Sequence, residues 1–140
     1  MDWTVIRYIC FLPVLAYASV LDVTTRIIPN RIYILLILTG LIGFNLSSLT
    51  GLLITGVPLC ITAALQKSFG GGDVKFGTLC GFVLKGTSGL MALGIGSILC
   101  LLTIPIARKI MKLPAKGTRI PLVPFFSVGC VITCVILRFF

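Results

Sequence analysis

Long apolar runs alternate with short polar segments along almost the whole chain, and this pattern restricts the possible folds more than any single residue does. Of the 140 residues, 58% are hydrophobic and 11% are charged, and the mean hydropathy is +1.18. Such a chain has too few polar residues to cover the surface of a soluble globule. We therefore expect an all-α integral membrane protein, because a helix satisfies its own backbone hydrogen bonds in lipid.

The apolar runs predict a bundle of six transmembrane helices that forms a single domain over residues 1–140. Gly, Pro, Ser, Asn or charged residues bound each run and favour helix ends. The expected helices are residues 3–21, 31–47, 50–66, 74–85, 88–107 and 120–138. The fourth is short, because about 12 residues rise only about 18 Å, less than a hydrocarbon core of roughly 30 Å. We expect either a polar funnel with local thinning at its outer end, or a turn within the membrane.

The cations indicate how the chain is oriented. The net charge is +9, from 12 Lys and Arg against three acids. Nine of the 12 cations fall around the first, third and fifth predicted loops, which the positive-inside rule makes cytoplasmic. Both termini are then outside, and the other cations, Arg7, Lys85 and Arg138, are expected to snorkel to the outer interface. The chain is thus predicted to be a multi-pass protein of the cell membrane, with cations that contact anionic lipids and not nucleic acid.

The cysteines give no sign of a metal site. The six cysteines lie mostly inside apolar runs, and the sequence has neither a Cys-x-x-Cys pair nor a histidine. Zinc sites need several such ligands at short spacing. We therefore expect small buried apolar residues at these positions, and no metal or other cofactor.

The acidic residues are the main candidates for chemistry. Only three occur, and Asp22 and Asp73 lie at the edges of apolar runs, in segments 22–30 and 70–75. A carboxylate is costly there, which makes both acids functional candidates. Two carboxylates can hydrolyse a peptide bond when one is ionised and activates water while the other is protonated and polarises the carbonyl. The sequence therefore predicts a catalytic aspartate pair toward the cytoplasmic side.

Three consecutive glycines, Gly70, Gly71 and Gly72, precede Asp73. They remove side chains where Asp73 must meet another helix and a substrate backbone, and they permit dihedral angles closed to other residues. We expect them to shape the site. The alternative is a plain glycine turn between two helices, with Asp73 capping the second.

Three further residues are candidates for site shaping or substrate binding. Lys75 follows Asp73 and can either meet a substrate carboxylate or anchor the helix at the membrane interface. Pro29 favours an extended entry, and Asn30 is a good N-cap for a helix that begins near Arg31. These structural roles are sufficient reasons for Pro29 and Asn30, and contact with substrate is the alternative.

Three segments together resemble the A24 family of type IV prepilin peptidases. They are an Asp followed shortly by Ile-Pro-Asn, a Gly-x-Gly-Asp-Val-Lys run, and Ile-Pro-x-x-Pro-Phe before the last helix. The resemblance implies a six-helix aspartyl peptidase that cleaves the leader from prepilins or pilin-like proteins at the cytoplasmic face, typically after a glycine. By matching position, Asp22 and Asp73 become the catalytic pair, Gly70 and Gly72 the motif glycines, and Lys75 the downstream lysine.

The chain also departs from part of that family. Bifunctional members have an additional N-terminal methyltransferase portion, whereas this sequence begins directly at a predicted membrane helix. The compact form is similar to peptidase-only members that serve tight-adherence or Flp-type pili, or archaeal flagellin and pilin processing. Two other functions fit six spans and two acids: a small proton- or cation-coupled transporter with the acids as ion sites, and an assembly scaffold.

Overall fold

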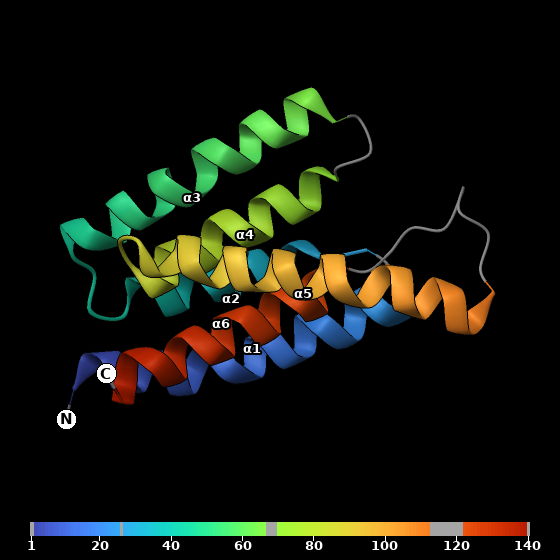
Figure 1. Ribbon diagram of the computed structural model, residues 1–140. Helices are drawn as coiled ribbons and strands as arrows, with labels where there is room; N and C mark the ends of the chain where they lie inside the picture. The colour runs from blue at the N-terminus through green and yellow to red at the C-terminus, as the bar shows by residue number, and fades with distance from the viewer. Residues whose placement is uncertain (1, 26, 67–69, 113–121, 140) are drawn as a thin grey trace.

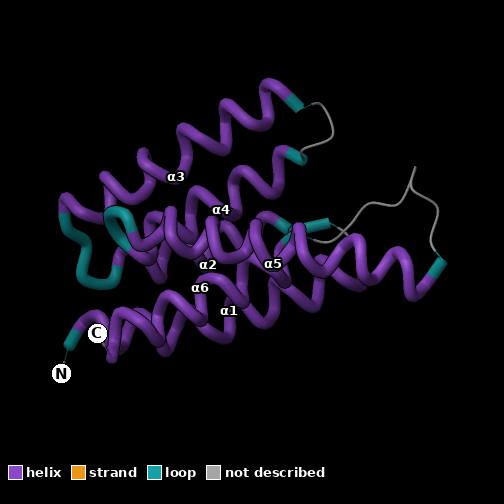
Figure 2. Tube along the Cα trace, in the orientation of Figure 1, coloured by secondary structure: helices purple, strands orange, loops and turns teal. Residues whose placement is uncertain are grey.

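The computed structural model describes residues 2–25, 27–66, 70–112 and 122–139, and these residues form six α-helices without a β-strand (Figure 1, Figure 2). The helices are α1 (Trp3–Thr25), α2 (Asn30–Leu41), α3 (Leu46–Leu65), α4 (Gly71–Leu84), α5 (Ser88–Met111) and α6 (Val123–Phe139). The all-α prediction is therefore confirmed.

Successive helices run in opposite directions along one bundle, so both ends of the chain lie at the same end (Figure 1). Helix α4 packs against α2, α3, α5 and α6, while α1 packs against α2 and α6. The opposite end of the bundle holds the end of α1 and the starts of α2, α4 and α6. We call it the acid end, because it carries Asp22 and Asp73.

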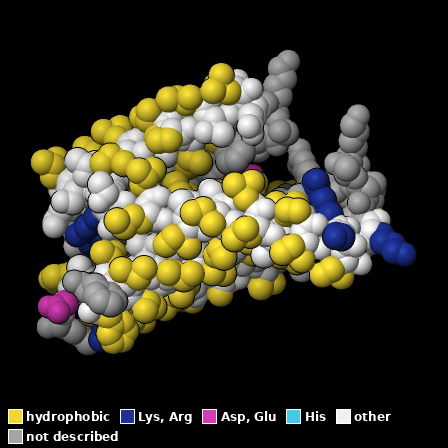
Figure 3. Space-filling model, in the orientation of Figure 1, with side chains coloured by type: hydrophobic (Ala, Val, Ile, Leu, Met, Phe, Trp, Pro, Cys, Tyr) yellow, Lys and Arg dark blue, Asp and Glu magenta, His cyan; other side chains and the backbone are white. Residues whose placement is uncertain are grey.

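The outer surface of the bundle is apolar, as expected for a membrane protein. Large hydrophobic side chains such as Leu65, Leu101 and Ile110 are 73% exposed or more, and hydrophobic side chains cover most of the face seen in Figure 3. Helices α1, α3 and α5 are long and apolar enough to cross a membrane, and α2 and α6 are shorter apolar helices. The chain is a membrane protein, and the crossing by all six helices stays a prediction.

Several helix boundaries differ from the prediction. Helix α1 continues to Thr25, and α4 begins at Gly71, so both acids lie inside helices. Helix α2 ends at Leu41 and not at residue 47, which makes it, with 12 residues, even shorter than the 14-residue α4. Gly43 ends it, with a φ of +63° at the position where a left-handed glycine commonly closes a helix. The fourth helix is short as predicted, and α2 is short beside it.

Arg7 connects the ends of these two short helices, and the prediction that it snorkels outward is wrong. Its side chain is 1% exposed. The guanidinium donates to the carbonyl oxygens of Ile42 at 2.8 Å, Gly43 at 2.8 Å and Val83 at 3.1 Å. The last carbonyls of a helix have no partner within the helix and carry the negative end of its dipole. Arg7 supplies hydrogen-bond donors to these carbonyl groups and a positive charge beside the negative dipole ends. Lys85 Nζ also donates a hydrogen bond of 2.9 Å to the Gly43 carbonyl oxygen.

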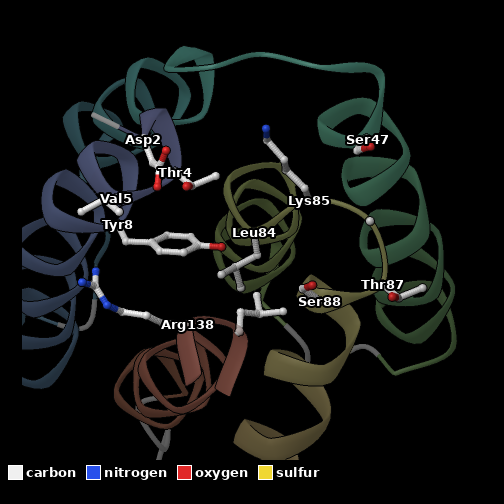
Figure 4. A pocket seen from close by; sticks show the side chains of 12 residues that line it. Asp2, Thr4, Val5, Tyr8, Ser47, Leu84, Lys85, Thr87, Ser88 and Arg138 are labelled. Carbon is white, nitrogen blue, oxygen red and sulfur yellow. The ribbon is translucent and has the colours of Figure 1, made fainter. Parts of the chain in front are cut away.

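A cavity of about 780 Å³ lies at this same end, opposite the acid end. It is lined by Asp2, Thr4, Val5, Tyr8, Ser47, Leu84, Lys85, Gly86, Thr87, Ser88, Leu137 and Arg138. Figure 4 shows the Tyr8 side chain reaching from α1 toward Leu84 at the end of α4. The cavity lies at the end of the short fourth helix, and the choice between a polar funnel and a turn within the membrane stays a prediction.

Glycines let the helices approach closely, as small residues do in membrane proteins. A Cβ atom on Gly51 of α3 would meet the carbonyl oxygen of Gly81 in α4, and one on Gly129 of α6 would meet the carbonyl oxygen of Ala92 in α5. These contacts fix α4 and α6, the two helices whose first residues face the candidate site.

Candidate active site

Asp22 lies in the last turn of α1 and contacts the start of α6. Its side chain is 7% exposed, and its Oδ2 atom accepts a hydrogen bond of 3.2 Å from the backbone N–H of Val123, the first residue of α6. The free N–H groups and positive dipole end of α6 favour a negative charge at this position. The start of α6 thus stabilises a negative charge on Asp22, which lies near the negative end of its own helix α1.

Pro124 is compatible with this contact. It lies in the first turn of α6, where a proline costs little because the first N–H groups of a helix have no partner within it. We expected the last helix to begin at residue 120. It begins instead at Val123, and Pro121 lies outside the described residues.

Asp73 is half-buried in the first turn of α4. This turn is closed by backbone bonds to the Gly70 carbonyl oxygen, 3.1 Å from the Asp73 nitrogen and 3.4 Å from the Val74 nitrogen. Asp73 therefore lies at the positive end of α4, just as Asp22 meets the positive end of α6. Both candidate acids share the same kind of electrostatic support.

The glycines before Asp73 leave room for neighbouring atoms, and they do not adopt unusual dihedral angles. Gly70 has φ −70° and ψ 137°, which other residues adopt readily, and Gly71 and Gly72 are helical. The prediction of dihedral angles closed to other residues is wrong. A Cβ atom on Gly72 would lie 3.2 Å from the Tyr33 hydroxyl oxygen, one on Gly70 would lie 3.3 Å from Asp73 Oδ2, and one on Gly71 would meet nothing within 4 Å.

Tyr33 is the residue of this region that sequence reasoning missed. Its hydroxyl group donates to the Gly72 carbonyl oxygen at 3.3 Å, and Lys75 Nζ lies 5.9 Å from the centre of its ring. Tyr33 lies on α2, which packs against α1 and α4, the two helices that carry the acids. The available signal was a tyrosine three residues after Asn30, in an otherwise apolar run.

The remaining predicted site residues lie near the same end. Pro29 is extended, as predicted, with φ −69° and ψ 150°, and it occupies the N-cap position of α2 without a side-chain cap. Asn30 is instead the first helical residue and is exposed. Lys75 is also exposed. The structure therefore brings Gly72 and Lys75 to Tyr33, and leaves Asn30 on the surface of the first turn of α2.

The cysteines do not gather into a site with acids or histidines. Cys80, Cys100, Cys130 and Cys134 are buried, whereas Cys10 and Cys60 are exposed, contrary to the expectation for those two. Exposure is compatible with their apolar character because the outer face of a membrane helix meets lipid. Among the described residues, no group of three His, Cys, Asp or Glu side chains is placed to hold a metal ion.

A comparison with protein families matches residues 9–105 to the type IV leader peptidase family. The chain belongs to the type IV leader peptidase family. The match spans more than half of the chain and includes Asp22, Asp73 and the residues around both, and it ends before the last helix. Comparisons with curated proteins and with solved structures gave no match. The family and the apolar helices together identify this leader peptidase relative as a protease of the membrane.

Proposed function

We propose that this member of the leader peptidase family is an aspartyl endopeptidase. It removes the N-terminal leader of prepilin or pilin-like precursors at the cytoplasmic face of the membrane, and Asp22 and Asp73 are its catalytic pair. The observation that carries the proposal is the position of the acids: both fall within residues 9–105, which match the family, and the end of α1 and the start of α4, which carry them, lie at one end of the bundle.

Two carboxylates that share one proton can perform the reaction without a cofactor. The ionised carboxylate takes a proton from water as the water oxygen attacks the scissile carbonyl carbon, and the protonated one gives its proton to the carbonyl oxygen. In the second step the proton taken from water passes to the amide nitrogen, the C–N bond breaks, and a hydroxyl proton returns to the other carboxylate. The pair ends as it began, with one proton.

The local electrostatics support this division of protons. Repulsion between neighbouring carboxylates raises the pKa of one member of a pair, so that the pair titrates as a unit. The starts of α4 and α6 oppose this effect, because their dipoles favour a negative charge beside Asp73 and Asp22. One negative charge at the site is thereby stabilised, while a second remains unfavourable.

The proposed orientation brings the acids to the precursor. With six crossings and both termini outside, the acid end faces the cytoplasm, where α5 also carries Arg108 and Lys109 in its last turn. Figure 3 shows Lys and Arg side chains at that end of the molecule. The basic leader then stays at the cytoplasmic surface, while the apolar helix of the precursor remains in lipid. The junction between them reaches the depth of the aspartate pair. Flp-type, tight-adherence and archaellin-type precursors have this form.

We expect Lys75 to contact a precursor near the cut, because it is exposed and follows Asp73 by two residues in α4. Many such precursors carry a glutamate shortly after the cleaved bond. We expect Lys75→Ala to reduce cleavage of the wild-type precursor several-fold, and to have little effect on a precursor in which that Glu is replaced by Gln. Measured cleavage rates that stay unchanged for both precursors would exclude this contact.

Coexpression with a panel of pilin precursors tests the proposed function. We expect one precursor class to shorten, with a new N-terminus that follows a glycine when it is sequenced, and no shortening beside the double variant Asp22→Asn, Asp73→Asn. Accumulation of each variant in membranes is checked by immunoblotting. Cleavage that survives the double variant would overturn the aspartate pair, and ion flux lost in that variant without any cleavage would favour the transporter.

A further inference from the structure

The first turn of α4 carries Asp73 but is weak by itself. It begins with Gly71 and Gly72, and its N-cap position is Gly70, which offers no side-chain cap. Glycine is among the poorest helix formers, because it loses the most conformational freedom on folding. A carboxylate that must keep a fixed position relative to another therefore lies on a turn that needs support from elsewhere in the bundle.

Tyr33 of α2 supplies such support through its hydroxyl group. The hydroxyl donates to the Gly72 carbonyl oxygen at 3.3 Å, and a carbonyl oxygen can accept this bond in addition to its bond within the helix. The missing side chain at Gly72 leaves room for the contact, since a Cβ atom there would lie 3.2 Å from the same hydroxyl oxygen. The bond joins the first turn of α2 to the first turn of α4.

The ring of Tyr33 makes a second contact with the same face of α4. Lys75 Nζ lies 5.9 Å from the ring centre, within the range of a cation–π interaction. Gly72 and Lys75 are three residues apart, a spacing that places them on one side of a helix. Tyr33 thus contacts α4 immediately before and two residues after Asp73, and its helix α2 also packs against α1, which carries Asp22.

We propose that Tyr33 is a positioning residue that holds the Asp73 turn in register with Asp22. This role rests on the proposed function, because it concerns the geometry of the same aspartate pair. Tyr33 contacts the backbone next to Asp73 and the Lys75 ammonium group. It affects catalysis by fixing the position of the turn that carries Asp73. Its side chain is half-buried and packs against the hydrophobic core, which gives it the rigidity that such a role needs.

The test compares Tyr33→Phe with Tyr17→Phe in the full-length chain, reconstituted in lipid with a precursor that the wild type cleaves. Tyr33→Phe removes the hydroxyl group and keeps the ring beside Lys75. Tyr17→Phe makes the same chemical change in α1 at a side chain that is 51% exposed. Two readouts are taken: steady-state cleavage over a range of pH, and hydrogen exchange at the amides of Asp73 and Val74, which close the turn.

We expect Tyr33→Phe to lower kcat roughly tenfold to a hundredfold with KM changed less than about twofold, as a small misplacement of a catalytic group does. The pH profile of kcat/KM should narrow, because carboxylates held farther apart repel each other less and their two pKa values converge. Exchange at Asp73 and Val74 should become several-fold faster. Tyr17→Phe should match the wild type in every readout.

Two results would overturn the proposal. Unchanged exchange at Asp73 and Val74 in Tyr33→Phe would show that the hydroxyl group does not hold the turn. Faster exchange at Asp73 and Val74, with kcat and the pH profile equal to those of the wild type, would show that the Tyr33 hydrogen bond does not matter for catalysis. Exchange is measured without substrate, so failure of this inference stays distinguishable from failure of the proposed peptidase function, in which the wild type itself would cleave no precursor.

Discussion

At the scale of single residues, the glycines that precede Asp73 have different surroundings although they are adjacent in the sequence. Gly72 lies against the Tyr33 hydroxyl oxygen, whereas a side chain on Gly71 would meet nothing within 4 Å. A methyl group is therefore tolerated at one position and forces a movement at the other. Because the movement would affect the Tyr33 contact, the two glycines should differ in their importance for cleavage.

We predict that Gly72→Ala lowers kcat/KM for leader cleavage roughly tenfold, whereas Gly71→Ala leaves it within about twofold. The reason is the 3.2 Å approach of the added Cβ atom to the Tyr33 hydroxyl oxygen. The loss should be smaller when Tyr33→Phe removes that oxygen, since residues in contact have non-additive effects. Steady-state kinetics in reconstituted lipid are measured for Gly71→Ala, Gly72→Ala, Tyr33→Phe and the double variant Gly72→Ala, Tyr33→Phe. Equal losses of kcat/KM in Gly71→Ala and Gly72→Ala would contradict the prediction.

The sequence could reveal the two acids but not Tyr33, which contacts the turn that carries Asp73. Asp22 and Asp73 are conspicuous because carboxylates are rare and costly in apolar runs. Tyr33 is an aromatic residue in an apolar run, as many core residues are, and its role depends on how α2 packs against α4. That packing joins residues 39 positions apart, a contact that local pattern does not specify.

At the scale of helices, the short lengths of α2 and α4 explain why an arginine is buried. Helices of 12 and 14 residues rise only about 18 and 21 Å. Their final carbonyl groups therefore need a partner inside the bundle, which Arg7 provides. Periodicity could not show the early end of α2, because apolar residues continue to Phe44 and Leu46. The decisive signal was Gly43, whose positive φ ends the helix.

We predict that Arg7→Met lowers the free energy of unfolding by at least about 2 kcal/mol, because it leaves three carbonyl groups with fewer donors. Arg138→Met is the matched control, since Arg138 is exposed in the last turn of α6, and it should change stability by less than about 0.5 kcal/mol. Unfolding curves in one detergent measure both. Equal stability of Arg7→Met and the wild type would show that Arg7 does not hold the helix ends.

At the scale of the whole molecule, the acids and the termini lie at opposite ends of the bundle (Figure 1). The distribution of cations predicted this separation from the sequence, because it placed the loops near Asp22 and Asp73 inside and the termini outside. The structure agrees on which segments share an end.

We predict that a reporter fused to Phe139 lies outside the cell, whereas one fused after Lys112, at the end of α5, lies in the cytoplasm. Six and five crossings, respectively, give these locations. Each site is fused to alkaline phosphatase, which is active only outside the cell, and separately to a fluorescent protein that matures only inside it. The Phe139 fusion should show phosphatase activity, and the Lys112 fusion should fluoresce. A fluorescent fusion at Phe139 would contradict the orientation and place the acids on the outer side.

The most direct test of the aspartate pair is the cleavage rate of purified chain in lipid vesicles with one precursor, for wild type, Asp22→Asn, Asp73→Asn and Asp2→Asn. Asp2 is the third acid and is exposed at the far end, so Asp2→Asn controls for the loss of one charge. Asn at position 22 keeps an oxygen for the Val123 N–H, so the fold should persist. We predict that each of Asp22→Asn and Asp73→Asn lowers the rate by roughly a thousandfold or more, with Asp2→Asn equal to wild type. Wild-type cleavage by either Asp22→Asn or Asp73→Asn would contradict the account.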